Sequence, residues 1–182
     1  ELLKYPELKG QAVVIGGRNT PAPAERADGR RVFGRLRQYV GRGVVTTSTY
    51  EARALGVFSA MGMMKAAQLA PDAYLLPADF NAYRDYSRRF KAAVAAIAPC
   101  IEDRGIDEIY IDLTPHEEPS NVIGRRLKEA VFEATGLTCS IAISPNKLLS
   151  KIGSELEKPD GLTILTYDDI PARIWPLSVG KI

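Results

Sequence analysis

The order of helices and strands between residues 80 and 167 constrains the fold of this chain more than any other feature of its sequence. Apolar residues recur at helical spacing from Phe80 to about Ala98, and two short strands follow around a turn at Arg104–Gly105. A helix, a strand, a further helix and a last strand complete the order α-β-β-α-β-α-β. We expect these elements over residues 80–98, 100–103, 106–114, 120–135, 137–144, 146–158 and 163–167.

This order predicts an α+β fold whose larger part is ferredoxin-like, because the split βαβ unit runs β-α-β-β-α-β. The match requires one more strand before the first helix. The chain opens with ELLKYPELKG, which is typical of a helix remnant, so we expect the sequence to start after that strand. We also expect Ser120 to cap the second helix and Gly136 to end it.

The residues before 79 predict a smaller α/β unit with little core of its own. Strands are expected over 12–16, 43–50 and 74–77, with two short helical segments between the last two. A polar stretch over 18–42 interrupts them and is too long for an ordinary connection. It holds seven arginines against two acids, although the net charge of the 182-residue chain is only +2. Such a run is typical either of a solvated loop or of a surface that faces phosphates.

The composition is that of a globular protein, with 46% hydrophobic and 25% charged residues. Cys100 and Cys139 have no metal-binding spacing and are expected to be buried free thiols in a reducing compartment. The sequence has no apolar run long enough to cross a bilayer and nothing that resembles a secretory signal. We therefore predict a cytoplasmic protein without a membrane partner.

Two adjacent acids, Asp107 and Glu108, stand at the head of an otherwise apolar strand. Neighbouring strand residues point to opposite faces, but two carboxylates directly after a turn can converge on one edge. Carboxylates this close repel each other unless a cation neutralises them, and Mg²⁺ takes one or two carboxylates together with substrate phosphates. The alternative is a solvent-exposed acid pair at a strand end.

Two further segments carry groups that bind phosphate. Where the strand over 43–50 turns into a helix, Thr47, Tyr50 and Arg53 can present a hydroxyl, a phenol and a guanidinium around the helix N-terminus. Lys158 lies beside a Pro-Asp-Gly turn, and from there a lysine can reach a triphosphate as a point charge. Ordinary capped helices with solvated side chains would show the same residues.

Three segments together resemble the Y-family translesion DNA polymerases, most closely the bacterial DNA polymerase IV type. In that family T-x-x-Y-x-A-R belongs to the fingers, S-[IL]-D-E-x-Y-[IL]-D carries palm acids, and N-K-x-x-[AS]-K-I-x-S-x-x-x-K-P-[ND]-G closes the triphosphate site. The corresponding segments here are TSTYEAR over 47–53, GIDEIYID over 105–112 and NKLLSKIGSELEKPDG over 146–161. Their order matches that of the family, and the resemblance covers nearly the whole chain.

The resemblance implies a role for each matched residue. Asp107 and Glu108 correspond to palm acids that hold two Mg²⁺ ions, for which Mn²⁺ can substitute. The residues that correspond to the family's grip on the β- and γ-phosphates of the incoming nucleotide are Thr47, Tyr50, Arg53 and Lys158. Those that correspond to fingers residues near the templating base are Phe58, Ser59 and Ala60.

The resemblance also divides the chain and exposes departures from the family. It implies fingers over 1–78, with 18–42 as an Arg-rich insertion loop, a palm over 79–168, and the truncated start of a thumb over 169–182. The family's first strand supplies another metal-binding Asp and an aromatic residue that excludes ribonucleotides, and this chain has neither. We therefore expect the chain as given to be inactive alone. Phe58 stands where Arg is common in the family.

The implied function is template-directed DNA synthesis of the low-fidelity, lesion-bypass class. Its implied partners are primer–template DNA and deoxynucleoside triphosphates, with a sliding clamp bound through regions outside this chain. A nucleotide cyclase on a related palm would explain the acids but not the TSTYEAR segment. A non-catalytic adaptor in DNA damage tolerance is the second alternative, and the presence of Asp107, Glu108, Arg53 and Lys158 argues against it.

Overall fold

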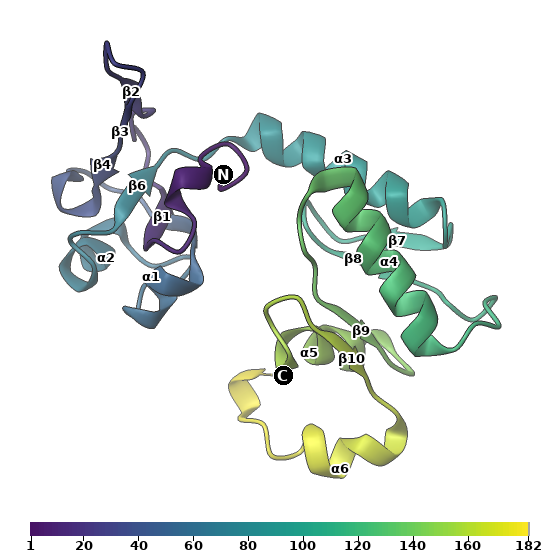
Figure 1. The fold of residues 1–182 in the computed structure, drawn as a ribbon. Coiled ribbons are helices and arrows are strands. Elements are labelled where there is room, and N and C mark those ends of the chain that lie inside the picture. The colour runs from purple at the N-terminus through teal and green to yellow at the C-terminus, as the bar shows by residue number, and fades with distance from the viewer. Residues whose placement is uncertain (182) are drawn as a thin grey trace. The chain divides into compact units, whose positions relative to one another are not determined.

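A four-stranded sheet of order β4-β6-β1-β5 organises the first part of the computed structural model, which describes residues 1–181 (Figure 1). The chain divides into two units, residues 1–80 and 81–182, and each is described by itself. In the first unit, β1 pairs antiparallel with β5 and parallel with β6, and β6 pairs antiparallel with β4. These strands are β1 (Val13–Gly16), β4 (Gly34–Arg35), β5 (Val45–Ser48) and β6 (Tyr74–Leu76).

Strand β1 is buried on both faces, which explains its uninterrupted apolar sequence. Successive strand residues point to opposite sides, so Val14 packs into one cluster while Val13 and Ile15 pack into another. The first cluster includes residues of the helices α1 (Tyr50–Ala54) and α2 (Met63–Leu69). The first unit therefore has a larger core than its sequence predicts.

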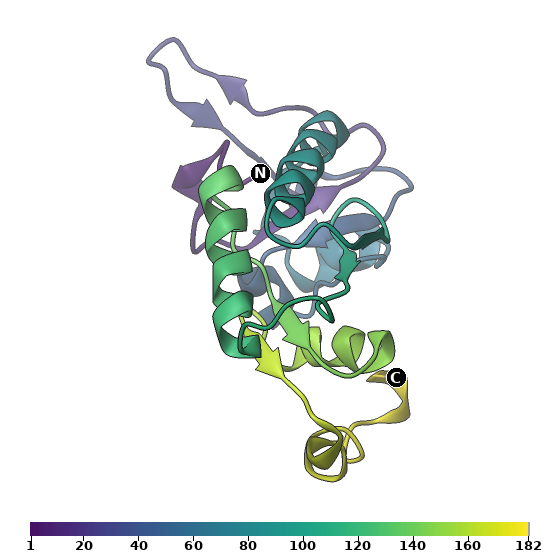
Figure 2. The ribbon, with the colours of Figure 1, turned by 90° about the vertical axis from the view of Figure 1, so that its right-hand side faces the viewer.

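The Arg-rich stretch over 18–42 is folded. Strands β2 (Ala24–Glu25) and β3 (Arg31–Val32) form an exposed antiparallel hairpin that projects from its unit (Figures 1 and 2). After it, β4 adds an edge strand to the sheet, and a 3₁₀ helix follows over Leu36–Gln38. Leu36 is fully buried and Tyr39 is buried beside it in the core cluster. A purely solvated loop therefore does not describe this stretch.

The second unit has the predicted order α-β-β-α-β-α-β, followed by one short helix and by 3₁₀ helices over Tyr167–Asp169 and Val179–Lys181. The strands are shorter than the sequence patterns indicate, because only their central residues form ladder hydrogen bonds. The elements are α3 (Phe80–Ala95), β7 (Ile101–Asp103), β8 (Ile109–Ile111), α4 (Ser120–Thr135), β9 (Ile141–Ile143), α5 (Lys147–Leu156), β10 (Leu162–Ile164) and α6 (Ile170–Arg173).

These strands form two separate pairs over one core. Strands β7 and β8 are antiparallel, and β9 and β10 are parallel. Both pairs pack on the same cluster of α3 and α4 side chains, which includes Val94, Ile123 and Leu127. Among residues 1–181, β8 and β9 are not hydrogen-bonded to each other or to a shared strand. The mixed α+β class is confirmed, with the sheet of the second unit in two halves.

Two local predictions were wrong. Pro119, not Ser120, is the N-cap of α4, because its carbonyl accepts the N–H groups of Val122 and Ile123 at 2.8 and 3.1 Å. The helix therefore begins at Ser120, one residue earlier than a cap at Ser120 would imply, although Gly136 ends it as predicted. Cys100 is exposed and Cys139 is half-buried, so neither is the fully buried thiol that was predicted. No helix within residues 1–181 is both long and apolar enough to cross a membrane.

Candidate active site

The adjacent acids Asp107 and Glu108 lie in the turn between β7 and β8, immediately before β8 begins. The N–H of Arg104 donates to the carbonyl of Glu108 at 3.1 Å and closes this turn. Asp103 supports it, because its carboxylate accepts Lys91 Nζ at 2.7 Å and the N–H of Gly105 at 2.9 Å. The Lys91 hydrogen bond, followed by that of Gly105, holds the pKa of Asp103 below its ordinary value. Both candidate acids are exposed on a braced turn.

Helix α5 faces this turn with two lysines. Lys151 forms an ion pair with Glu108, and Lys147 forms one with Glu102 on β7. The hydrogen bond from Lys147 holds the pKa of Glu102 below its ordinary value. Within residues 1–181, Asp107 has no hydrogen-bond or ion-pair partner. The two acids therefore differ: one carboxylate is neutralised by a lysine and the other is open to a ligand.

The acid turn fits part of a divalent cation site. Carboxylate oxygens are the ligands that Mg²⁺ prefers, and Asp107 presents an unengaged pair of them. Glu108 would have to leave Lys151 or share its charge with the cation. In the part of the chain that the structure describes, no group of three or more potential ligands gathers around one point. These residues can therefore supply one or two carboxylates, and a two-ion site needs others.

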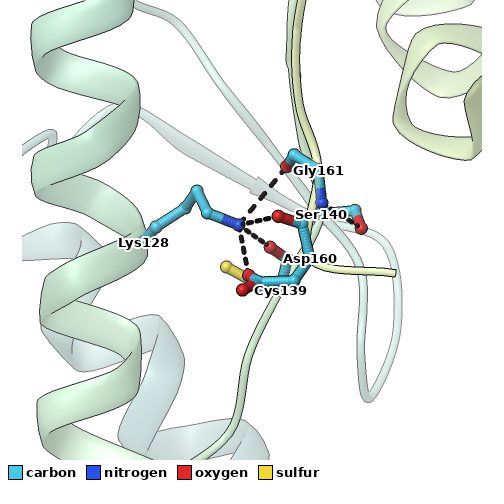
Figure 3. A network of polar contacts seen from close by, with 5 residues as sticks. All are labelled: Lys128, Cys139, Ser140, Asp160 and Gly161. Carbon is cyan, nitrogen blue, oxygen red and sulfur yellow. Dashed lines mark hydrogen bonds and ion pairs between the residues drawn. The ribbon is translucent and has the colours of Figure 1, made fainter. Parts of the chain in front are cut away.

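Lys158 lies just beyond the end of α5 and donates to Glu155 Oε1 at 2.5 Å. The Pro-Asp-Gly turn that follows it is held from the side by α4. There the ammonium of Lys128 meets the carbonyls of Cys139, Asp160 and Gly161 at 2.6, 2.8 and 3.4 Å, and also the Asp160 carboxylate (Figure 3).

Lys128 is a positioning residue that the sequence reasoning missed. Its side chain is only 19% exposed, and it joins the segment that leads into β9 to the turn before β10 (Figure 3). No local pattern marks it, because a lysine on a helix is usually solvated and its partners lie 11 to 33 residues away. The turn that follows Lys158 is thus fixed by a contact from another element.

The other phosphate-binding candidates lie in the first unit, at the end of β5. Thr47 pairs with β1 in the sheet and is half-buried. Arg53 donates from Nε to the carbonyl of Ser48 at 3.3 Å and stacks 5.2 Å from the ring centre of Tyr50. The side chain of Thr49 accepts the N–H of Ala52 and caps α1. Helix α1 has only five residues, so the candidates at this position are the side chains and not the helix end.

The segment Phe58–Ser59–Ala60 forms an exposed turn beside the start of β5. The N–H of Ala60 donates to the carbonyl of Val45 at 2.9 Å, and the N–H of Val45 donates to Met61 at 2.8 Å. Phe58 is 52% exposed. The turn therefore leaves this ring accessible from solvent.

The structure thus assembles the candidate residues in two groups, one in each unit. Asp107, Glu108 and Lys158 belong to the second unit, beside or beyond α5. Those of the first unit are Thr47, Tyr50, Arg53, Phe58, Ser59 and Ala60. Each group is organised by its own sheet and core.

Comparison with known proteins identifies the family. Residues 1–155 match the impB/mucB/samB family. The chain belongs to this family. Among curated relatives, a DNA polymerase IV from Shewanella denitrificans is 37% identical to this chain over the chain's full length. A DNA polymerase IV from Staphylococcus aureus is 33% identical over 99% of the chain. The chain spans 46% of the length of each, so about half of those proteins has its counterpart here.

Solved structures agree with this assignment. The chain superposes over its whole length on a Y-family DNA polymerase chimera with a TM-score of 0.78 at 29% identity, covering 49% of that chain. DinB from Sulfolobus solfataricus gives a TM-score of 0.78 at 27% identity, with 48% covered. An insertion ternary complex of Dbh DNA polymerase gives 0.77 at 28%, with 49% covered. The resemblance to Y-family polymerases, predicted from three sequence segments, is confirmed.

Proposed function

We propose that the full-length protein is a template-directed DNA polymerase of the translesion, low-fidelity class. The observation that carries this proposal is the turn that holds Asp107 and Glu108. Asp107 is exposed there without a partner among the described residues, and Glu108 forms an ion pair with Lys151 of the segment over 146–161. The family and the names of the relatives, DNA polymerase IV, support the same activity. The substrates would be primer–template DNA and deoxynucleoside triphosphates, in the cytoplasm.

Each group of residues has a proposed part in nucleotide addition. Asp107 and Glu108 would hold Mg²⁺, or Mn²⁺ in its place, which supplies charge neutralisation at the reacting phosphate and lowers the pKa of a bound hydroxyl. Arg53 is proposed to bind the triphosphate as a bidentate donor, and Lys158 is proposed to bind it as a point charge. The remaining proposed phosphate ligands are Thr47 and Tyr50.

The Phe58–Ser59–Ala60 turn is the proposed contact with the templating base. Its exposed phenyl ring can stack on a base of any identity, since every base has a π-face. A polymerase that accepts damaged templates benefits from a contact that reads no hydrogen-bonding edge. This contact would therefore be tolerant of sequence and of many lesions.

The catalytic group is incomplete within residues 1–181, which the structure describes, and we propose that the rest of the full-length protein completes it. A two-ion site needs a further carboxylate, and no third ligand joins Asp107 and Glu108 among the described residues. Strands β8 and β9 also lack a shared partner there. One additional strand that carries an acid would satisfy both requirements. The chain as given should accordingly not extend a primer.

Primer extension tests the proposal. The full-length protein should add deoxynucleotides to a recessed primer in Mg²⁺, and Asp107→Ala and Glu108→Ala should each lower kcat by at least about 100-fold, as the loss of a metal-binding or charge-stabilising group typically does. Glu129→Ala is the matched control, because this acid is exposed on α4 and remote in sequence from the turn. Primer extension at the wild-type rate by both the Asp107→Ala and the Glu108→Ala protein would contradict the assignment of these acids to the metal site.

A non-catalytic adaptor is the second candidate function. Residues 1–181 hold no complete metal-binding group, which is compatible with this function as well as with the polymerase. A folded full-length protein that binds primer–template DNA but extends no primer with Mg²⁺ or Mn²⁺ would favour the adaptor. A sliding clamp, if bound by either form, would contact regions outside this chain.

A further inference from the structure

A pocket of about 430 Å³ lies on the first unit, and nearly all of its wall comes from the Arg-rich stretch. Leu75 of β6 is the one lining residue from outside residues 18–42. Three arginines line it, and among the described residues that form its wall there is no acid. The lining arginines are Arg18, Arg35 and Arg42. The volume is within the range of specific ligand sites, and the charge of the wall selects an anion.

Tyr39 holds two of these arginines in place. Its hydroxyl accepts the N–H of Arg18 at 3.4 Å and donates to the carbonyl of Arg42 at 3.1 Å, so it joins two segments 24 residues apart. The packing around it is close: a Cβ at Gly43 would lie 2.7 Å from the Tyr39 hydroxyl, and one at Gly17 would lie 2.5 Å from its ring. Only glycine fits at these two positions. The pocket is therefore built on a buried aromatic residue of the core.

Two of the three pocket arginines, Arg18 and Arg42, differ from most arginines of the same stretch. Those that are ion-paired are Arg30, Arg31 and Arg37, with Asp28, Glu7 and Asp72. Arg35 is engaged as well, because it stacks 3.7 Å from the ring centre of Tyr74 and donates to a backbone carbonyl.

By contrast, neither Arg18 nor Arg42 pairs with an acid anywhere in residues 1–181. Both side chains are exposed at the pocket. Tyr39 fixes the backbone of both residues, so two unneutralised guanidiniums start from fixed positions at the pocket. Such a pair forms a site for phosphate groups, which arginine binds with paired hydrogen bonds.

The pocket adjoins the turn that we propose contacts the templating base. Arg42 is followed by Gly43, whose carbonyl accepts the N–H of Met63 at 3.0 Å, and by Val44, which is bridged to Gly62. The next residue, Val45, is bonded to Ala60 of the Phe58–Ser59–Ala60 turn. Arg42 and the Phe58–Ser59–Ala60 turn therefore both lie beside the start of β5.

We propose that Arg18 and Arg42 bind backbone phosphates of the single-stranded template ahead of the templating base. This inference rests on the proposed polymerase function and names a further contact for its template. The site lies on the first unit alone and is separate from the residues that we assign to the triphosphate. Binding is to phosphate and carries no sequence information.

The test uses fluorescence anisotropy of the full-length protein with two primer–templates. One has a single-stranded template overhang of about ten nucleotides, and the other has an overhang of one. The Arg18→Ala/Arg42→Ala variant should have a dissociation constant for the long overhang that is at least roughly tenfold higher. The reason is that losing a hydrogen bond to a charged group lowers affinity by about tenfold or more. The plot of log K against log salt concentration should also become less steep by about 1.4, because two phosphate contacts to a single strand are lost.

Controls separate this inference from folding and from general charge. Arg26→Ala/Arg30→Ala removes the same charge from the same stretch outside the pocket and should leave the difference between overhangs unchanged. Tyr39→Phe keeps both arginines but removes the hydroxyl that ties them, and should weaken long-overhang binding by a smaller factor. Equal losses on both overhangs, or an equal loss in the Arg26/Arg30 variant, would overturn the inference.

Two further measurements distinguish template phosphates from nucleotide phosphates, and the template-binding proposal from the polymerase proposal. If the Arg18/Arg42 variant raised the KM for deoxynucleotides and left the overhang dependence unchanged, the pocket would be a nucleotide subsite and the template assignment would be wrong. If the wild-type protein extended no primer but bound long overhangs through this pocket, the polymerase proposal would fail while the phosphate site stood.

Discussion

Four oxygens converge on the ammonium of Lys128, which has only three protons to donate. Three of them are backbone carbonyls, and of these the carbonyl of Gly161 also accepts the N–H of Ile141 at 3.0 Å. A lysine inserted from α4 satisfies them at once and fixes the Asp160–Gly161 turn (Figure 3). Lys158, proposed to bind triphosphate, directly precedes that turn, so its position depends on Lys128.

Replacing Lys128 with methionine tests this dependence. Lys128→Met keeps most of the side-chain volume but removes the charge and its hydrogen bonds. We expect a loss of about 1–3 kcal/mol in the free energy of unfolding measured with urea, most of it from the carbonyl bonds, because the Asp160 carboxylate is half exposed and its ion pair is screened. The KM for deoxynucleotides should also rise in the full-length protein.

Arg125→Met is the control, because Arg125 is exposed on the same helix and has no ion-pair partner among the described residues. A Lys128→Met protein with wild-type stability and wild-type KM would show that the turn holds its shape without this lysine.

The element order of the second unit could be predicted because its signals are local. Apolar periodicity marks α3 and α4, and a glycine ends α4. The strands β2, β3 and β4 could not be predicted, since each has only two residues and shows no period. Within the candidate site, the adjacent acids were visible in the sequence. The partner of Glu108 was not, because Lys151 is 43 residues away and only the packing of α5 brings it there.

The folded state of the Arg-rich stretch gives a prediction at the scale of this element. Leu36 is 0% exposed in the core of the first unit, so Leu36→Ala should lower the free energy of unfolding by about 2–5 kcal/mol in urea denaturation, through lost burial and the cavity left behind. Val40→Ala is a matched control four residues away, at a side chain that is 92% exposed. Equal and small effects of both substitutions would mean that the stretch is a solvated loop after all.

At the scale of the whole molecule, the unpaired edges of β8 and β9 indicate how residues 1–182 fit into the full-length protein. In the β7–β8 ladder the N–H of Asp112 donates to Cys100 and that of Arg104 to Glu108. Hydrogen bonds alternate along an antiparallel pair, so the N–H groups of Ile109 and Ile111 face away from β7. In the parallel pair, Ile141 and Ile143 bond to β10, which leaves the N–H of Ala142 facing away from it.

Native-state hydrogen exchange on the full-length protein tests whether a strand bonds to these edges. If one additional strand pairs with β8 and β9, the amides of Ile109, Ile111 and Ala142 should exchange nearly as slowly as the core of their unit, because exchange then requires that unit to open. The amide of Asp103 is the internal control: it points away from β8 at the outer edge of β7 and should exchange fast. Fast exchange at all four positions would mean that no strand bonds to β8 and β9, and the further carboxylate of the metal site would then have to come from another kind of element.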